Sequence, residues 1–282
     1  RLNVYRRGSD SLLGRYHHFR LHPLSLREID ESSIPSPAQL LERIFRRELD
    51  SRDERQKALE SMMRFGAFPE PFLAQDERKA RLWRRGRVES VIREDLRDLS
   101  RIPDLSRVEM LAALLPERVG SLFSITPLRE TLEVSFDTVR RWVESLKELY
   151  YAFELKPYTR SMARSIRKAG KIYLWDFGEV ATEAARFENL VACHLLKACD
   201  YWTDTGQGMF SLSFLRNKEQ EEIDFLLLRD RKPWLPVEVK LNDTRPSAAW
   251  DRYWGSLRCQ RAIQLVAKPG VWDVHERGAG EL

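Results

Sequence analysis

Two apolar runs near the C-terminal end decide the fold: Glu222-Ile223-Asp224-Phe225-Leu226-Leu227-Leu228 and Pro236-Val237-Glu238-Val239-Lys240. Both runs are typical of β-strands. Strand alternation places Glu222 and Asp224 on one face of the first strand, and Glu238 and Lys240 on one face of the second. The first run is apolar almost throughout after Asp224, which indicates burial on both faces. The pattern therefore predicts carboxylates and a lysine at the ends of neighbouring strands.

The segments around these runs follow an α/β order. The patterns predict a helix at 178–198, strands at 201–203, 209–215, 223–229 and 236–241, a helix at 247–257 and a strand at 262–267. Glu188 falls on the first helix of this series. We expect a domain with a mixed sheet and helices packed against it.

Composition limits the class of protein. A chain of 282 residues with 43% hydrophobic residues can form two or three packed domains. Net charge is +5, and arginine pairs recur along the chain, which favours contact with phosphate groups. The three cysteines form no C-x-x-C pair, so they fit a reducing cytoplasm better than a disulfide scaffold or a zinc ribbon. No apolar stretch approaches the ~20 residues of a membrane span.

The N-terminal part divides into two regions. Residues 1–30 carry a helix-like piece at 9–13 and a strand-like run at 16–21, too little to bury a core. Because the chain starts without methionine, we expect an N-terminal truncation. Residues 31–103 are predicted to be a helical lid, broken at 65–71 by Phe65-Gly66-Ala67-Phe68-Pro69-Glu70-Pro71.

Residues 104–176 are consistent with a winged-helix domain. Helices are predicted at 105–115, 124–132 and 137–150, followed by extended segments at 151–155 and 172–175 around a basic loop. In such a unit the second helix of the helix-turn-helix lies in the major groove of DNA, and flanking basic residues contact the phosphates. The candidate DNA-binding residues lie on the third helix and in the loop: Arg140, Arg141, Arg160, Arg164, Arg167 and Lys168. The alternatives are a solvated charged face or a module that contacts protein.

The acidic pattern suggests metal-dependent chemistry. Phosphodiester hydrolysis needs an activated water and neutralisation of a phosphorane-like anion, and Mg²⁺ held by carboxylates supplies both. We expect Asp224 and Glu238 to bind the metal, Glu188 to complete or assist its shell, and Lys240 to orient or deprotonate the water. An E-x-K tripeptide alone is uninformative, because the same tripeptide pattern also occurs at 77–79 and 154–156. The alternative is a surface ion pair of Glu238 with Lys240 and a strand-end turn at Asp224.

A helical Glu, a strand-borne Asp and E-x-K in this order resemble the PD-(D/E)XK, or restriction-endonuclease-like, fold. The whole chain is similar to a broad prokaryotic family of AAA-superfamily P-loop ATPases with a C-terminal domain of unknown function. The matching stretches are Ser11-Leu12-Leu13-Gly14-Arg15, Leu21-His22-Pro23-Leu24-Ser25, the break at 65–71, Val91-Ile92-Arg93-Glu94-Asp95-Leu96, Tyr173-Leu174-Trp175-Asp176-Phe177-Gly178, Phe187-Glu188-Asn189-Leu190-Val191, Glu222-Ile223-Asp224-Phe225 and Val237-Glu238-Val239-Lys240. The resemblance makes residues 1–30 the tail of an ATPase core and residues 177–282 a nuclease-like domain.

The chain departs from that family at its nucleotide loop. No Walker A motif, G-x-x-x-x-G-K-[ST], occurs in it, so ATP binding is expected only in the intact parent protein. The leading hypothesis is a cytoplasmic, DNA-binding part of an AAA-type ATPase whose nuclease-like domain cleaves phosphodiesters with Mg²⁺. The alternative is a non-catalytic module that binds protein or DNA in an ATP-regulated switch. A plain winged-helix transcription factor is a third, weaker possibility.

Overall fold

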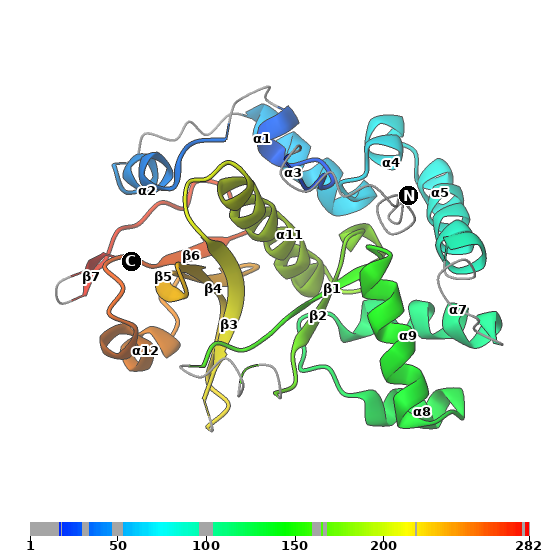
Figure 1. Ribbon diagram of the computed structural model, residues 1–282. Helices are drawn as coiled ribbons and strands as arrows, with labels where there is room; N and C mark the ends of the chain where they lie inside the picture. Colours follow the sequence, from blue (N-terminus) through cyan, green and yellow to red (C-terminus); the bar gives the residue numbers. More distant parts are fainter. Residues whose placement is uncertain are drawn as a thin grey trace.

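The computed structural model describes residues 17, 19–29, 34–46, 53–95, 104–159, 165, 168–217, 219–277 and 280–281. The chain is a mixture of helices and strands with a mixed sheet near its C-terminus, which confirms the predicted fold class at this level (Figure 1). The predicted helix at 9–13 lies outside the described residues. No helix in the described part is both long enough and apolar enough to cross a membrane.

The N-terminal region is helical. Its elements are α1 (Leu26–Ile29), α2 (Pro37–Phe45), α3 (Asp53–Phe65), α4 (Pro69–Ala74), α5 (Glu77–Glu89) and the π-helical η2 (Ser90–Asp95). The predicted break at 65–71 is confirmed, since α3 ends before Gly66, whose φ of +83° favours glycine. The described residues of the predicted strand at 16–21 form no strand. Arg20 instead makes ion pairs with Asp200 and Asp204.

The middle region contains the three predicted helices. These are α7 (Leu105–Leu114), which continues into the 3₁₀ turn η3 (Leu115–Arg118), α8 (Ile125–Leu132) and α9 (Phe136–Glu148). Helix α9 begins after Ser135, whose hydroxyl accepts a hydrogen bond from the Thr138 N–H. The predicted stripe of α9 is buried, because Val139, Val143 and Leu146 face the main core.

Two short strands follow α9. Strands β1 (Ala152–Leu155) and β2 (Lys171–Leu174) pair antiparallel, as expected for the two extended segments. They do not project into solvent, because all but one of their residues are buried. After β1, the Tyr158 N–H donates to the Phe214 carbonyl at 2.7 Å, in a parallel bridge between Pro157 and Phe214. This bridge joins the β1–β2 pair to the C-terminal sheet.

The C-terminal region is built on a four-stranded sheet. Its elements are η4 (Phe177–Glu179), α11 (Glu183–Asp204), β3 (Phe210–Arg216), β4 (Glu222–Arg229), β5 (Lys232–Lys240), α12 (Ala249–Leu257), β6 (Ile263–Val266), β7 (Glu276–Arg277) and β8 (Gly280–Glu281). The order in this sheet is β3-β4-β5-β6, with β5 and β6 parallel and the other neighbours antiparallel. The sheet is therefore mixed.

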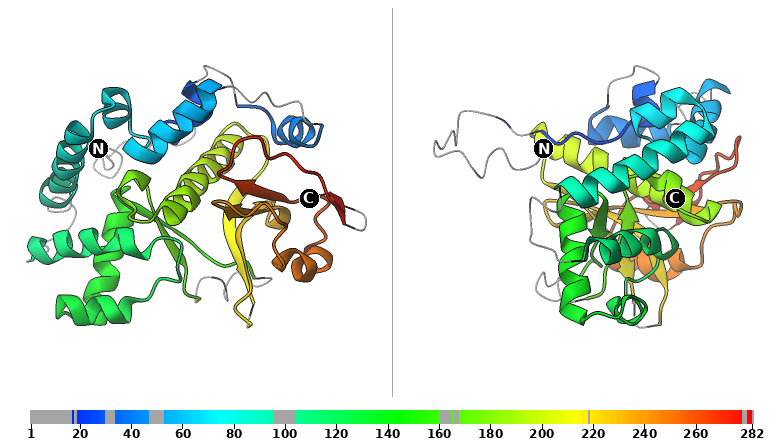
Figure 2. Two further views of the ribbon diagram at one scale, coloured as in Figure 1. Left: turned by 180° about the vertical axis from the view of Figure 1, so that it is seen from behind. Right: turned by 90° about the vertical axis from the view of Figure 1, so that its right-hand side faces the viewer.

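Helices cover both faces of this sheet. Helix α11 packs on one face as part of the main core, and it lies between the sheet and the N-terminal helices (Figures 1 and 2). On the other face, Trp250 of α12 packs in a separate cluster with Leu226 and Leu228. The predicted burial of β4 on both faces is confirmed.

One predicted strand is wrong. Residues 201–203 form the last turn of α11, which extends the predicted helix to Asp204. The cause is tertiary packing, because the fully buried Trp202 ring contacts the rings of Phe210 and Trp234. Packing of this kind outweighs the local β-propensity of Tyr-Trp-Thr.

Candidate acidic site

The side chains predicted from the two strand motifs meet at one end of the sheet. The β4–β5 register places Asp224 opposite Glu238, one residue beyond the last backbone pair. The carboxylate of Asp224 accepts the Val239 N–H at 2.8 Å, and Glu238 accepts the Asp224 N–H at 3.3 Å. Lys240 donates to Glu238 at 2.6 Å. The two strands are thus linked through carboxylates where their backbone ladder ends.

Glu188 of α11 reaches the same site through residues that the sequence reasoning missed. The hydroxyl of Tyr173 on β2 donates to Glu188 Oε1 at 2.7 Å, and Lys171 Nζ lies 3.3 Å from the same oxygen. Lys171 Nζ also forms an ion pair with Glu222 and lies 4.0 Å from Asp224 Oδ1. Lys171 therefore links Glu188 to the acidic residues of β4.

A signal for these two residues was present in the sequence. Lys171 and Tyr173 are the polar members of the run Lys171-Ile172-Tyr173-Leu174, and strand alternation puts them on one face. A lysine in an apolar strand needs a buried partner. What the local sequence could not provide is the identity of that partner, because it lies on elements far along the chain.

Burial controls the protonation of the site. Burial raises the pKa of Glu188 and Asp224, and the Lys171 ammonium opposes this rise in both. Burial also raises the pKa of Glu238, and the neighbouring charge of Asp224 raises it further. Burial lowers the pKa of Lys171, but attraction to Glu188, Glu222 and Asp224 outweighs it, so the pKa is raised. Lys171 is therefore a charged group with a side chain only 2% exposed.

The backbone of Gly120 closes the site beside Glu188. Gly120 has a φ of +75°, and a Cβ built on it would lie 2.9 Å from Glu188 Oε2. This position therefore requires glycine for two reasons, its left-handed backbone and the close carboxylate. The loop after η3 therefore passes so close to the Glu188 carboxylate that it leaves no room for a side chain.

The arrangement does not fit a metal ion as it stands. Carboxylate oxygens suit Mg²⁺ and Mn²⁺, and oxygens of Glu188, Glu222 and Asp224 surround one position. That position is taken by the Lys171 ammonium. Within the part of the chain that the structure describes, no three His, Cys, Asp or Glu side chains are placed to hold a metal.

Two of the predicted DNA-binding residues, Arg140 and Arg141, make their contacts on α9 itself. Arg140 and Arg141 are exposed on α9, as the stripe pattern implies. Both contact Asp137, since Arg140 pairs with its carboxylate at 2.8 Å and Arg141 donates to its carbonyl at 3.4 Å. Lys168 is exposed shortly before β2. The remaining three, Arg160, Arg164 and Arg167, lie outside the described residues.

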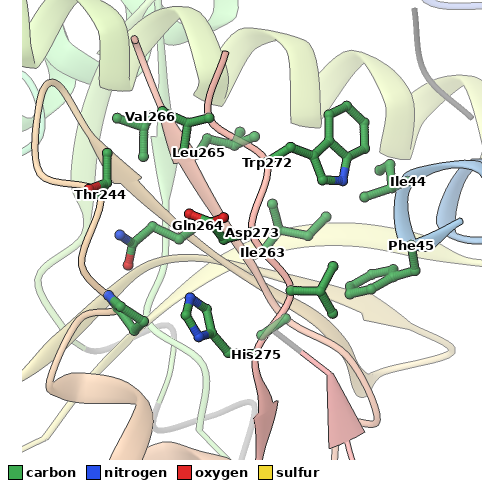
Figure 3. A pocket seen from close by; sticks show the side chains of 14 residues that line it. Ile44, Phe45, Thr244, Ile263, Gln264, Leu265, Val266, Trp272, Asp273 and His275 are labelled. Atoms are coloured by element: carbon green, nitrogen blue, oxygen red, sulfur yellow. The ribbon is translucent and has the colours of Figure 1, made fainter. Parts of the chain in front are cut away.

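A separate hollow lies beside β6, the last strand in the order β3-β4-β5-β6. It has a volume of about 280 Å³ between α2, β6 and residues 271–275, and its walls include Phe45, Ile263 and Trp272 (Figure 3). The Gln264 side chain in its wall is already bonded, accepting from the Ser247 N–H and donating to the Arg245 carbonyl. None of the acidic-site residues lines this hollow.

Two family models match parts of the chain. Residues 56–189 match the family model described as domain of unknown function DUF8612, and residues 184–267 match domain of unknown function DUF4143. The second is a domain found in AAA-ATPase-associated proteins. No solved structure matches the chain.

Two curated mycobacterial proteins are similar to part of the chain. The uncharacterized proteins Rv2008c of Mycobacterium tuberculosis and Mb2031c of Mycobacterium bovis are each 28% identical to it over 131 residues. The match covers 46% of this chain and 30% of each relative, so the chain spans less than a third of their length.

The acidic site draws on both matched regions. Lys171 and Tyr173 lie in the first region, and Asp224, Glu238 and Lys240 lie in the second. Glu188 falls within the six residues, 184–189, that the two matches share. The site is therefore shared between the two matched regions.

Proposed function

We propose that this chain is the C-terminal part of an AAA-type ATPase and that its nuclease-like domain acts on the phosphodiester bonds of DNA. The observation that carries the proposal is the convergence of Glu188, Asp224, Glu238 and Lys240 at one end of the sheet. The succession of α11, β3, β4, β5, α12 and β6 with a mixed sheet supports the likeness to restriction-endonuclease-like enzymes. The DUF4143 match supports the link to ATPases.

Lys240 is the member of the site best placed to meet a phosphate. Its side chain is 35% exposed, whereas that of Glu238 beside it is 4% exposed. Burial lowers the pKa of Lys240, but the hydrogen bond to Glu238 and the negative charges of Glu238, Asp224 and Glu188 together outweigh burial, so the pKa is raised. A fixed ammonium at the mouth of the site can contact a phosphate oxygen.

The test is cleavage of plasmid and branched DNA with added Mg²⁺ or Mn²⁺. We expect the wild-type chain to nick DNA, and Asp224→Asn and Lys240→Ala to reduce the rate by at least about 100-fold. Lys156→Ala is a matched control, because Lys156 ends a second E-x-K tripeptide and bonds Glu154 at 2.6 Å, away from the site. Equal rates in all four proteins would refute catalysis at this site.

A second candidate is a nuclease-fold module that binds protein or DNA without cutting it. The Lys171 ammonium favours this function, since it already neutralises the carboxylates that a catalytic metal would use. Titration calorimetry separates the two candidates. Failure of the wild-type chain to bind Mg²⁺ or Mn²⁺ at millimolar concentration, together with failure to nick DNA, would support the non-catalytic module.

DNA binding by the α9 surface is a separate part of the proposal. The charge of Arg140 is partly offset by the Asp137 carboxylate, so we expect weak binding with a strong dependence on salt. Fluorescence anisotropy with duplex DNA tests this in wild type and in the double variant Arg140→Ala/Arg141→Ala. An unchanged affinity in the double variant would remove α9 from the interface.

A further inference from the structure

The position of Lys171 is unusual for a lysine. It stands at the start of β2, in a strand whose four residues are all buried. Its ammonium lies among oxygens of Glu188, Glu222 and Asp224, and 5.5 Å from the centre of the Phe214 ring. A buried charge is tolerated only when it is paired, and here the acidic residues supply the partners.

The backbone fixes this lysine in place. Lys171 pairs with Leu155 in the β1–β2 ladder and forms a bridge with Leu122 on its other side. The Gly170 carbonyl accepts the Phe123 N–H at 2.7 Å. The side chain can therefore leave the acidic site only by changing rotamer or by a shift of β2.

A charge count shows what Lys171 contributes. The site holds four carboxylates and three cations: Glu188, Glu222, Asp224 and Glu238 against Lys171, Lys240 and Arg216, which pairs with Glu222 at 2.7 Å. With every group ionised the formal sum is −1, and without Lys171 it is −2. Removing the Lys171 ammonium therefore takes a partner from the oxygens of Glu188, Glu222 and Asp224 and makes the net charge of the site more negative.

We infer that Lys171 is an internal cation that competes with a divalent metal ion for the acidic site. Mg²⁺ binds oxygen at about 2.0–2.1 Å, and an ammonium group bonds it at about 2.8 Å, so the two cannot share the same oxygens. A divalent cation therefore binds this site only when the Lys171 side chain withdraws. The inference builds on the proposed function, because it describes how that same site is kept closed.

The test compares Mn²⁺ binding to the full chain and to Lys171→Met, by titration calorimetry and by loss of the free-ion electron spin resonance signal. We expect the variant to bind Mn²⁺ at least tenfold more tightly, which corresponds to about 1.4 kcal/mol. Lys147→Met is the matched control, because the Lys147 side chain is only 21% exposed and, like Lys171, pairs with more than one carboxylate, here Glu144 and Glu154 outside the site. A folded Lys171→Met variant with wild-type affinity would overturn the inference.

A second measurement applies if the Lys171→Met variant is unstable in the absence of metal. Removing Lys171 leaves carboxylates buried together, so metal should stabilise the folded state of the variant by mass action. We expect millimolar Mn²⁺ to raise the melting temperature or restore refolding of Lys171→Met, and to leave Lys147→Met unaffected. A variant that Mn²⁺ neither stabilises nor refolds would also overturn the inference.

The results separate this inference from the proposed function. Tighter Mn²⁺ binding by Lys171→Met, without DNA nicking by any protein, would support the internal cation and refute the nuclease. Metal-dependent nicking by the wild-type chain, with unchanged Mn²⁺ affinity in the variant, would support the nuclease and refute the internal cation.

Discussion

Replacing Glu179 by glutamine is expected to stabilise the protein at neutral and alkaline pH. Glu179 lies in η4, where one carboxylate oxygen accepts the Tyr151 hydroxyl at 2.9 Å. The other oxygen is buried without a hydrogen-bond partner among the described residues. Burial, and then the negative charge of Asp176, raise the pKa of Glu179 from 4.5 to about 7.

The sign of the effect follows from proton binding in the two states. Below about pH 4.5 Glu179 is protonated whether the chain is folded or unfolded. Between about pH 4.5 and 7 the unfolded chain releases this proton and the folded chain keeps it, so the free energy of unfolding falls as pH rises. Above about pH 7 the fall in the free energy of unfolding is complete. The gap between the two pKa values corresponds to about 3 kcal/mol.

The assay is urea unfolding of wild type and Glu179→Gln from about pH 4.5 to about pH 8.5. Glutamine can still accept the Tyr151 hydroxyl but cannot ionise. The variant should therefore gain up to about 3 kcal/mol over wild type across this range. Glu148→Gln, at an exposed position on α9, is the control and should follow wild type. Parallel stability curves for wild type and Glu179→Gln would refute the reasoning.

Two further stability predictions use chemical denaturation. Gly120→Ala and Gly206→Ala place alanine at the same φ of +75°, which costs about 1–2 kcal/mol each. Only Gly120→Ala also meets the Glu188 carboxylate, so it should cost more, and equal losses would contradict the contact. Arg84→Ala leaves the buried Asp176 without its 3.1 Å ion pair and should cost about 3 kcal/mol. A loss under about 1 kcal/mol, typical of exposed pairs, would contradict this prediction.

The helices of the middle region could be predicted because their signals are local. Helix α9 has a capping serine at 135 and an apolar stripe at helical spacing, and its bounds agree with the prediction to within two residues. The end of α11 could not be predicted in this way. Its last turn is helical because Trp202 packs against side chains from β3 and β5, and that contact is invisible in the local pattern.

The same division holds for the acidic site. Alternation along β4 and β5 predicted that Glu238 and Lys240 share one face of their strand and that Asp224 lies on a neighbouring strand, and the structure brings the three into contact. The pattern could not show that β2 lies across this end of the sheet. Lys171 and the sheet carboxylates are brought together by the chain path through α11, so only the folded chain reveals the cation between them.

The position of Lys171 makes the β1–β2 pair an integral part of the acidic site. A cut at residue 176, between the two predicted domains, would remove both Lys171 and the Tyr173 hydroxyl from Glu188. The carboxylates of α11 and β4 would then face one another without the cation that offsets their burial. Because β1 also continues into a bridge with β3, the same cut would expose one edge of the sheet. The middle region and the four-stranded sheet therefore stabilise each other through this site.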